Sequence, residues 1–298
     1  MTPLNQSESA VTEDLIACGI LSTCCVFGLI TNGGLIYATW KSKTFINPYG
    51  ILCAIIGFLN CCFLATFTAF TVIPIIYDGI MEAKVGQIFN SIYYSIILLH
   101  ILISVNRLCS ISMPLKYMCI FGGKKSLLMA LSMIAISAGF WFGSYFHWRC
   151  LFDFDKSLYL WFFEDHQCAE VFYSVNLYFQ ISMFIIILFI DIIAFRLILI
   201  WKKKTTEFKQ SKLSNVPQLR SEIIFFSQTC VSSFIYAVIF IVGSIIEPLF
   251  TFDKWALFLL HTIVWVLGHA IDGVIIGFAQ WNILLHTKKA VTIIVRPT

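Results

Sequence analysis

The sequence predicts an all-α membrane protein, a bundle of seven transmembrane helices. Three observations predict it: the composition, the uncharged stretches and the distribution of basic residues. Hydrophobic residues make up 59% of the 298-residue chain and charged residues only 12%, against roughly 25% charged in a soluble domain. One compact core cannot bury this much apolar surface, so the rest is expected to face lipid.

Seven stretches contain no Asp, Glu, Lys or Arg. They run over residues 15–40, 44–77, 85–106, 126–148, 171–190, 223–246 and 255–271. A helix needs about 20 mostly apolar residues to cross the hydrocarbon. Apolar sequence continues past Asp191 in the fifth stretch and past Asp272 in the seventh, so both acids are expected inside helices. The stretches are continuous rather than alternating, which favours helices over the strands of a barrel.

The basic residues indicate the orientation, because short cytoplasmic loops retain Lys and Arg. With the N-terminus outside, the inner loops and the C-terminal tail hold 16 of the 20 basic residues, and the outer face carries 12 of the 16 acids. Asn5, in the sequon Asn5-Gln6-Ser7, is a candidate glycosylation site on that outer side. We expect an extracellular segment over 1–14, a seven-helix domain over 15–280 and a cytoplasmic tail over 281–298.

The end of the third helix carries the stretch NRLCSISMPLKY, residues 106–117. Arg107 lies at the inner membrane boundary, with Pro114 seven and Tyr117 ten residues later. An isolated Arg there simply reaches to the interface. The stretch, however, resembles the Arg-Tyr region and the second-loop Pro-Leu-x-Tyr of rhodopsin-like G-protein-coupled receptors. An Arg facing the bundle needs an acceptor, and Asn106 carries no charge, so Glu222 at the inner end of the sixth helix is the expected partner.

The wider pattern resembles a narrower group, the nematode serpentine receptors of class X, from about Gly28 to Phe278. The residues that carry it are Gly28, Asn32, Tyr49, Gly50, His100, Asn106, Arg107, Glu222, Phe225, Phe226, Gln228, Trp265, His269, Asp272 and Gly273. The resemblance implies a chemoreceptor of the plasma membrane of a sensory cell or its cilium. It implies a small-molecule ligand outside, a heterotrimeric G protein inside and no cofactor.

The sequence also departs from rhodopsin-like receptors. Gly57 is expected where their second helix usually carries an Asp, so a sodium site is not implied there. The Cys at the outer end of the third helix and the Cys-Trp-x-Pro of the sixth are absent, and Asp272-Gly273 stands where Asn-Pro is common. These departures favour a divergent chemoreceptor over a hormone or amine receptor.

Two further sets of polar residues are candidates for function. His269 and Asp272, three apart on one helical face, form either a polar switch or plain interhelical contacts. A metal site is not expected, because only His100 could add a third ligand. The outer halves of the third, fifth, sixth and seventh helices are expected to line a ligand cavity, although interfacial aromatics also form membrane belts. The expected lining residues are Gln87, Asn90, Tyr93, Tyr94, Asn176, Ser244, Glu247, His261, Thr262 and Trp265.

Of the 11 cysteines, Cys150 and Cys168 lie in the acidic outer loop between the fourth and fifth helices. They are the pair exposed to an oxidising compartment. A bridge within this loop and two free thiols are both consistent with the sequence.

Other functional classes fit the sequence less well. A small transporter is expected to show repeats, broken helices and several intramembrane charges. An intramembrane hydrolase needs a metal or nucleophile constellation, which the sequence lacks, so no enzymatic activity is expected. The basic inner loops need no nucleic-acid partner, because the orientation accounts for their charge. A nonsignalling or orphan seven-helix protein remains the alternative, since the altered switch residues can reflect lost coupling.

The orientation leads to a direct prediction. An epitope tag before Met1 should be stained by antibody on intact cells, and a tag after Thr298 only after permeabilisation, because 16 of the 20 basic residues lie on the C-terminal side of the membrane. The opposite staining would invert the assignment of every loop.

Overall fold

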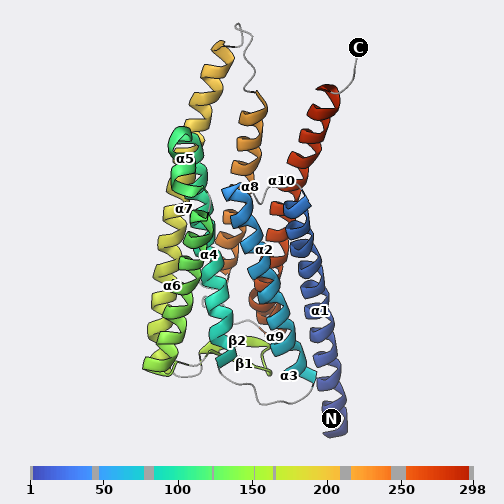
Figure 1. Cartoon of the computed structure of the whole chain (residues 1–298). Coiled ribbons are helices and arrows are strands. Elements are labelled where there is room, and N and C mark those ends of the chain that lie inside the picture. Colours follow the sequence, from blue (N-terminus) through green and yellow to red (C-terminus); the bar gives the residue numbers. More distant parts are fainter. Residues whose placement is uncertain are drawn as a thin grey trace.

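Seven helices in the described part of the chain are long and apolar enough to cross a membrane, which confirms the predicted seven-helix fold. The computed structural model describes residues 3–41, 47–76, 84–122, 124–150, 152–163, 166–208, 216–242 and 253–294. Among them, side chains are described for 11–41, 47–76, 85–122, 124–150, 152–163, 169–203, 223–242, 253–279 and 281. The helices run side by side, and the two termini lie at opposite ends of the bundle (Figure 1).

The membrane-crossing segments are built from helices with the following bounds. They are α1 (Pro3–Lys41), α2 (Pro48–Phe67) continued by the π-helical turn η2 (Thr68–Val72) and α3 (Ile73–Ile76), α4 (Lys84–Ser112), α6 (Lys125–Trp148), α7 (His166–Phe208), α8 (Val216–Ile241), and α9 (Lys254–Leu257) continued by η5 (Phe258–Ile263) and α10 (Val264–Ile294). A short helix α5 (Pro114–Phe121) and two strands, β1 (Phe152–Asp155) and β2 (Leu160–Phe163), lie between crossings.

Proline and side-chain caps set two of the helix starts. The side chain of Asn47 accepts a hydrogen bond from the backbone N–H of Tyr49, and Pro48 fills the first turn of α2, where its missing N–H costs nothing. Met113 leaves the helical conformation between α4 and α5, with φ −135° and ψ 58°. The residue before a proline disfavours helical geometry, so Pro114 ends α4 and begins α5.

The helix α4 lies at the centre of the bundle. It packs against α2, α6, α7 and α8, whereas α1 packs against α2 and α10. In the most apolar stretch of α4, 72% of the residues are buried, against 22% in the corresponding stretches of α6 and α7. These two helices expose Leu, Ile and Phe side chains along their length. We call the end of the bundle with the strands the outer end and the end with α5 the inner end, following the predicted orientation.

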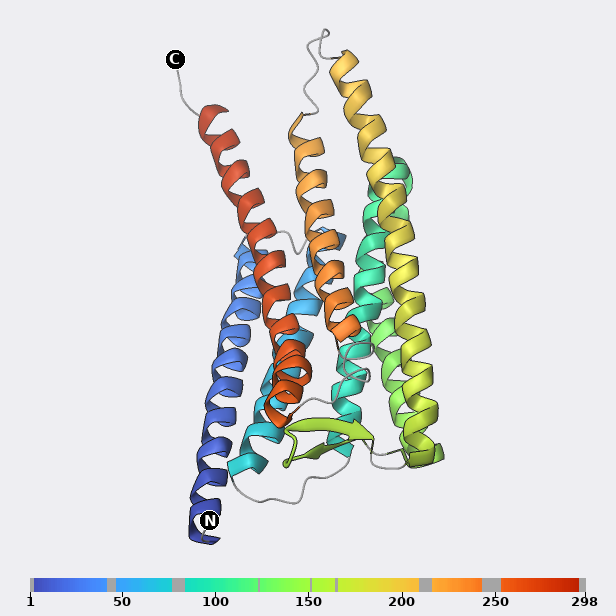
Figure 2. The same ribbon diagram turned by 180° about the vertical axis from the view of Figure 1, so that it is seen from behind.

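The strands β1 and β2 form an antiparallel hairpin across the outer end (Figure 2). Trp161 of β2 donates its indole N–H to the Thr71 hydroxyl at 3.2 Å, and Thr262 of η5 donates to the backbone oxygen of Tyr159 at 2.6 Å. The backbone oxygen of Phe152 lies so close to Gly86 of α4 that a Cβ there would be 1.8 Å from it. The hairpin is therefore fixed to α4, η2 and η5.

A hydrogen bond and two ion pairs join the turn of this hairpin to α1 and α9. Tyr159 donates its hydroxyl to Asp14 at 2.6 Å, and Lys156 forms an ion pair with the same carboxylate at 3.4 Å. Lys254 pairs with Glu13 at 3.3 Å and lies 4.0 Å from the centre of the Tyr159 ring. Burial and the neighbouring Asp14 carboxylate raise the pKa of Tyr159, so its hydroxyl stays a donor at neutral pH.

Three features of the structure were not among the sequence-based expectations. The hairpin in the outer loop was not expected. Helix α1 begins at Pro3 and so includes most of the expected extracellular segment, and α10 reaches Ile294, well into the expected tail. Neither proline nor glycine occurs in residues 4–14 or 280–294, so no helix breaker stands in these extensions.

Cys150 is disulfide-bonded, and nine other cysteines in the described part of the chain are free. This leaves Cys168, whose side chain lies outside the described residues, as the candidate partner. Peptides digested without reduction should contain Cys150 linked to Cys168. The Cys150→Ser variant should lose roughly 3 kcal/mol of stability, because an 18-residue separation is no longer closed in the unfolded chain.

The matched control is Cys119→Ser, since Cys119 is free and exposed. It should unfold like the wild type. Recovery of both loop thiols in unlinked peptides would remove the bridge.

Candidate functional site

A cavity of about 670 Å³ lies at the outer end, beneath the hairpin. Helices α4, α6, α7, α8 and α10, the turn η5 and both strands contribute to its walls. The described lining residues are Asn90, Tyr93, Tyr94, Trp141, Phe152, Leu160, Trp161, Phe162, Phe163, Ala169, Glu170, Tyr173, Ser174, Asn176, Gln180, Ile239, Phe240, Leu260, His261 and Trp265. A cavity of this size, mostly apolar with a few polar groups, is typical of a small-molecule site.

The structure places the residues expected in the cavity in three groups. Six of them line it, namely Asn90, Tyr93, Tyr94, Asn176, His261 and Trp265. Gln87 and Thr262 instead hydrogen-bond the backbone of Cys150 and Tyr159, so they support the hairpin and do not line the cavity. Ser244 and Glu247 lie outside the described residues, as does the side chain of Asn5.

Sequence reasoning missed the part of the wall supplied by the hairpin. Phe152, Trp161 and Phe163 all line the cavity. The signal was present, because residues 152–155 alternate Phe and Asp and an Asp-Lys-Ser turn precedes a second aromatic stretch. Gln180 on α7, one turn below Asn176, was also missed.

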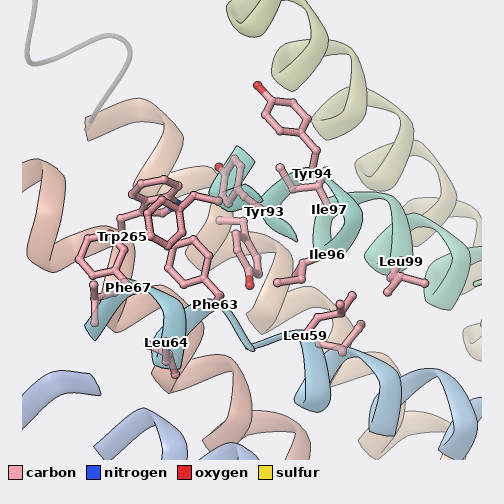
Figure 3. Packing of buried hydrophobic residues seen from close by; sticks show 14 of the residues in the cluster. Leu59, Phe63, Leu64, Phe67, Tyr93, Tyr94, Ile96, Ile97, Leu99 and Trp265 are labelled. Atoms are coloured by element: carbon pink, nitrogen blue, oxygen red, sulfur yellow. The ribbon is translucent and has the colours of Figure 1, made fainter. Parts of the chain in front are cut away.

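Aromatic rings form a continuous column from the hairpin into the core. Trp161 packs edge-on against Phe89 at 4.7 Å between ring centres, and Phe89 contacts Phe67 at 5.4 Å. Figure 3 shows Phe63, Phe67 and Trp265 gathered beside Tyr93. The ring centres of Phe63 and Trp265 are 5.0 Å apart. These tilted and edge-on contacts suit the charge distribution of aromatic rings. The column links the cavity wall to the polar residues below it.

The carboxylate of Asp272 lies at the centre of the core, with 1% of its surface exposed. Its Oδ1 accepts a hydrogen bond from Ser232 of α8 at 2.7 Å, and its Oδ2 accepts from Asn60 of α2 at 3.2 Å. The Nε2 of His100 on α4 lies 3.3 Å from Oδ2. One side chain of α10 is thus held by groups from three other helices, as a buried carboxylate requires.

Asn60 connects Asp272 to the other polar residues of the core. We call Asp272, Ser232, His100, Asn60, Asn32 and His269 the polar cluster. Its amide nitrogen donates to Asn32 at 3.1 Å as well as to Asp272, so its oxygen is left to accept from His269 Nδ1 at 2.8 Å. This fixes the proton of His269 on Nδ1. His269 and Asp272 are therefore joined through Asn60.

Gly57 lies where α2 packs against α1. A Cβ at Gly57 would meet Leu35 and Ile36 of α1 at 3.0 and 3.3 Å, so this residue permits close helix packing. The side chain of α2 that reaches the polar cluster is Asn60, three residues later and nearly one turn along the same helix.

Asn32 connects the cluster to α1. Its amide nitrogen donates to the backbone oxygens of Gly28 and His269, at 2.9 and 3.0 Å. A Cβ at Gly273 would lie 2.7 Å from the Asn32 side chain, and one at Gly28 would clash with Leu64 and Ala270. These two glycines let α1 and α10 approach closely enough for the bonds to form.

At the inner end, Arg107 of α4 lies between two aromatic rings. Its guanidinium carbon is 3.4 Å from the centre of the Tyr49 ring on α2 and 3.8 Å from that of Phe225 on α8. Only 4% of its surface is exposed, and the Tyr49 hydroxyl donates to Gln228 of α8. A desolvated cation between aromatic faces gains about 2 kcal/mol or more. We call Arg107, Tyr49 and Phe225 the arginine clamp.

The neighbouring Asn106 and Tyr117 are brought together as well. The Asn106 amide nitrogen donates to the Tyr117 hydroxyl at 3.1 Å, and that hydroxyl is 3.3 Å from the Asn106 oxygen. Pro114 makes this possible, since the break at Met113 turns α5 back toward α4. The side chain of Glu222 lies outside the described residues, so its pairing with Arg107 stays a prediction.

The cavity, the polar cluster and the arginine clamp lie in line along two helices. On α4, Tyr93, His100 and Arg107 are spaced seven residues apart, and on α10 Trp265 and Asp272 have the same spacing. Seven residues are about two helical turns, so each set shares one face. In the described residues, no group of three or more His, Cys, Asp or Glu is arranged to hold a metal ion.

The fold and these sites define a seven-helix membrane protein of the receptor type. The sequence matches the family of serpentine type 7TM GPCR chemoreceptors Srx over residues 23–279. The chain belongs to this family, and the resemblance inferred from its motifs is confirmed. A comparison with curated proteins finds no match.

The polar cluster predicts a specific loss of stability. Asp272→Ala should lower the free energy of unfolding by about 3 kcal/mol, because the donors of Ser232, Asn60 and His100 lose a common buried acceptor. Thermal unfolding in detergent can be followed with a thiol-reactive dye, since the chain has free buried cysteines.

Ser132→Ala is the control, because Ser132 on α6 is exposed and bonds only its own helix. It should melt at the wild-type temperature. Equal melting of Asp272→Ala and Ser132→Ala would show that the cluster does not support the fold.

Proposed function

We propose that this chain is a chemosensory receptor that binds an external small molecule in the outer cavity and activates a heterotrimeric G protein at its inner end. Membership of the chemoreceptor family and seven apolar helices make it a multi-pass membrane protein of receptor type. The ligand, the G protein and residence in the plasma membrane of a sensory cell are parts of the proposal.

One observation carries the proposal. Direct ring contacts join the wall of the cavity to the cluster around Asp272. Trp265 lines the cavity and contacts Phe63, and Phe63 packs on the ring of His269 at 4.0 Å between centres. A ligand that moves Trp265 therefore acts on the cluster around Asp272 within two contacts.

The arginine clamp supplies the element with two states. Arg107 holds the inner ends of α2 and α8 through Tyr49 and Phe225. If α8 moves outward, the guanidinium loses one ring and becomes available to a partner in the opened cleft. Ligand binding need only favour the open arrangement to raise its population.

The inner surface beside the clamp offers an apolar contact. On α5, Leu115 is 95% exposed and Met118 is 59% exposed, next to the basic Lys116. Apolar residues exposed on a short helix beyond the bilayer suit a protein partner. An amphipathic helix of a G protein that inserts between the inner helix ends would contact this surface and Arg107 together.

The clamp predicts opposite effects of two substitutions. Arg107→Ala should reduce basal nucleotide exchange to the level of membranes without receptor, because the group that contacts the G protein is gone. Glu222→Gln should raise basal exchange about fivefold, because an ion pair at a partly hydrated boundary is worth about 1 kcal/mol. The measurement is guanine nucleotide exchange on a panel of heterotrimeric G proteins in membranes, at equal surface expression.

Arg196→Ala is the matched control, because Arg196 is an exposed boundary residue of α7. It should behave like the wild type. Normal exchange by Arg107→Ala at the cell surface would reduce Arg107 to a boundary residue. Absence of exchange from the wild type on every G protein would favour the nonsignalling alternative.

A further inference from the structure

We propose that the outer cavity takes an uncharged, lipid-soluble molecule with an oxygen acceptor, such as a ketone or an ester, and that this molecule arrives from the bilayer through a groove between α6 and α7. The inference rests on the proposed receptor function and names the ligand class of the same cavity. It follows from the charges, the unmet hydrogen-bond donors and a second cavity.

The charges around the cavity disfavour an anion. Among the described lining residues Glu170 is the one charged side chain, and it is exposed. The outer face has four basic residues in all, of which Lys156 and Lys254 are paired with Asp14 and Glu13. Arg149 is exposed and not part of the wall.

The remaining basic residue, Lys84, has its side chain outside the described residues. Residues 164–168 and 243–252, whose side chains also lie outside the described part, contain no Lys or Arg. A carboxylate or phosphate would therefore be desolvated among aromatic rings without a cation in the described wall.

Hydrogen-bond donors without partners point to an acceptor on the ligand. The indole N–H of Trp141 and the amide nitrogen of Asn90 are buried in the cavity wall and bond no other group in the described part of the chain. An indole N–H can only donate. Each unmet donor costs about 1–3 kcal/mol, which an oxygen of the ligand would recover.

Two amide acceptors of the same wall are already used. Gln180 accepts from the Tyr93 hydroxyl at 3.4 Å, and Asn176 accepts from the Gln180 amide nitrogen at 2.7 Å. The groups left to bond a ligand therefore include the donor hydrogens of Trp141 and Asn90. The positive end of the indole N–H dipole would repel a cationic group placed directly beside it.

A second cavity of about 200 Å³ indicates the route. It lies between α4, α6 and α7 and shares Tyr94, Trp141 and Asn176 with the main cavity. Its other lining residues are Leu98, Ile136, Ser137, Phe140, Val175 and Phe179. Because the only hydroxyl among them, that of Ser137, bonds the backbone of Ser91, the groove offers an apolar surface.

The groove faces the lipid side of the bundle. Ile136 is 61%, Phe140 47% and Val175 42% exposed, and all three lie within the membrane-crossing parts of α6 and α7. A molecule dissolved in the bilayer meets these residues first. A change of side-chain rotamer at Asn176, which is half-buried, would then admit it to the main cavity.

Photolabelling tests the ligand class without a known ligand. The probe is methyl para-benzoylbenzoate, a neutral aromatic ketone and ester that crosslinks under light, and its charged counterparts are para-benzoylbenzoate and para-benzoylbenzyl trimethylammonium. The full chain in lipid nanodiscs is labelled, and labelling of peptides with Tyr94, Trp141 or Asn176 is normalised to lipid-exposed peptides. The neutral probe should label the cavity peptides best.

The donor is tested by Trp141→Phe, which keeps a ring and removes the N–H. Labelling by the neutral probe should fall about threefold, as expected for one hydrogen bond. Trp148→Phe is the control, since Trp148 on the same helix is exposed and outside the cavity. If Trp141→Phe does not fold, Asn90→Leu removes the second donor at a similar side-chain volume, and a similar fall is expected.

The route is tested by Val175→Trp, which fills the groove and should slow labelling by membrane-loaded probe at least threefold. Val171→Trp, at an exposed position of α7 outside the groove, should not change the rate. Equal rates in the two variants would overturn the route. Stronger normalised labelling by either charged probe, or no effect of both donor substitutions, would overturn the ligand class.

These results are independent of signalling. Cavity labelling by the neutral probe in a chain that activates no G protein would refute the receptor function and support the ligand class. Normal nucleotide exchange without such labelling would do the reverse.

Discussion

The structure depends above all on a carboxylate buried in a membrane bundle. Asp272 is tolerated in the core because Ser232, Asn60 and His100 all direct hydrogen-bonding groups at it. Those groups come from α8, α2 and α4, and Asn60 extends the connection to Asn32 of α1. Five of the seven crossings are therefore tied to one acidic group. Apolar packing alone would give these helices little preference for one register in lipid.

This constraint explains how the two ends of the bundle can influence each other. Trp265 lies seven residues before Asp272 on α10, and Arg107 lies seven residues after His100 on α4. The cavity wall and the arginine clamp are thus each two helical turns from a residue of the cluster. In the proposed function, a displacement at either end would change the bonds of Asp272. Helix α8 contributes to the cluster through Ser232 and to the clamp through Phe225.

The sequence predicted the helical frame well, because uncharged stretches and basic loops are local signals that lipid imposes directly. It also predicted six of the residues on the cavity wall. Asn60 was missed, since one polar residue on a uniformly apolar helix shows no contact until its neighbours are known. The hairpin was missed although the alternation of Phe and Asp in residues 152–155 is a local signal for a strand. The aromatic clamp around Arg107 depends on contacts between α2, α4 and α8 that no local pattern encodes.

We infer that Asp272 keeps the inner end of α8 against Arg107. The most direct test is the distance between spin labels at Ser112→Cys on α4 and Ile223→Cys on α8, with Cys119→Ser to remove an exposed thiol, measured by pulsed electron paramagnetic resonance. The account predicts one main distance in this background and, when Asp272→Asn is added, a second, longer population as α8 moves away. An unchanged distance distribution in the Asp272→Asn protein would contradict it.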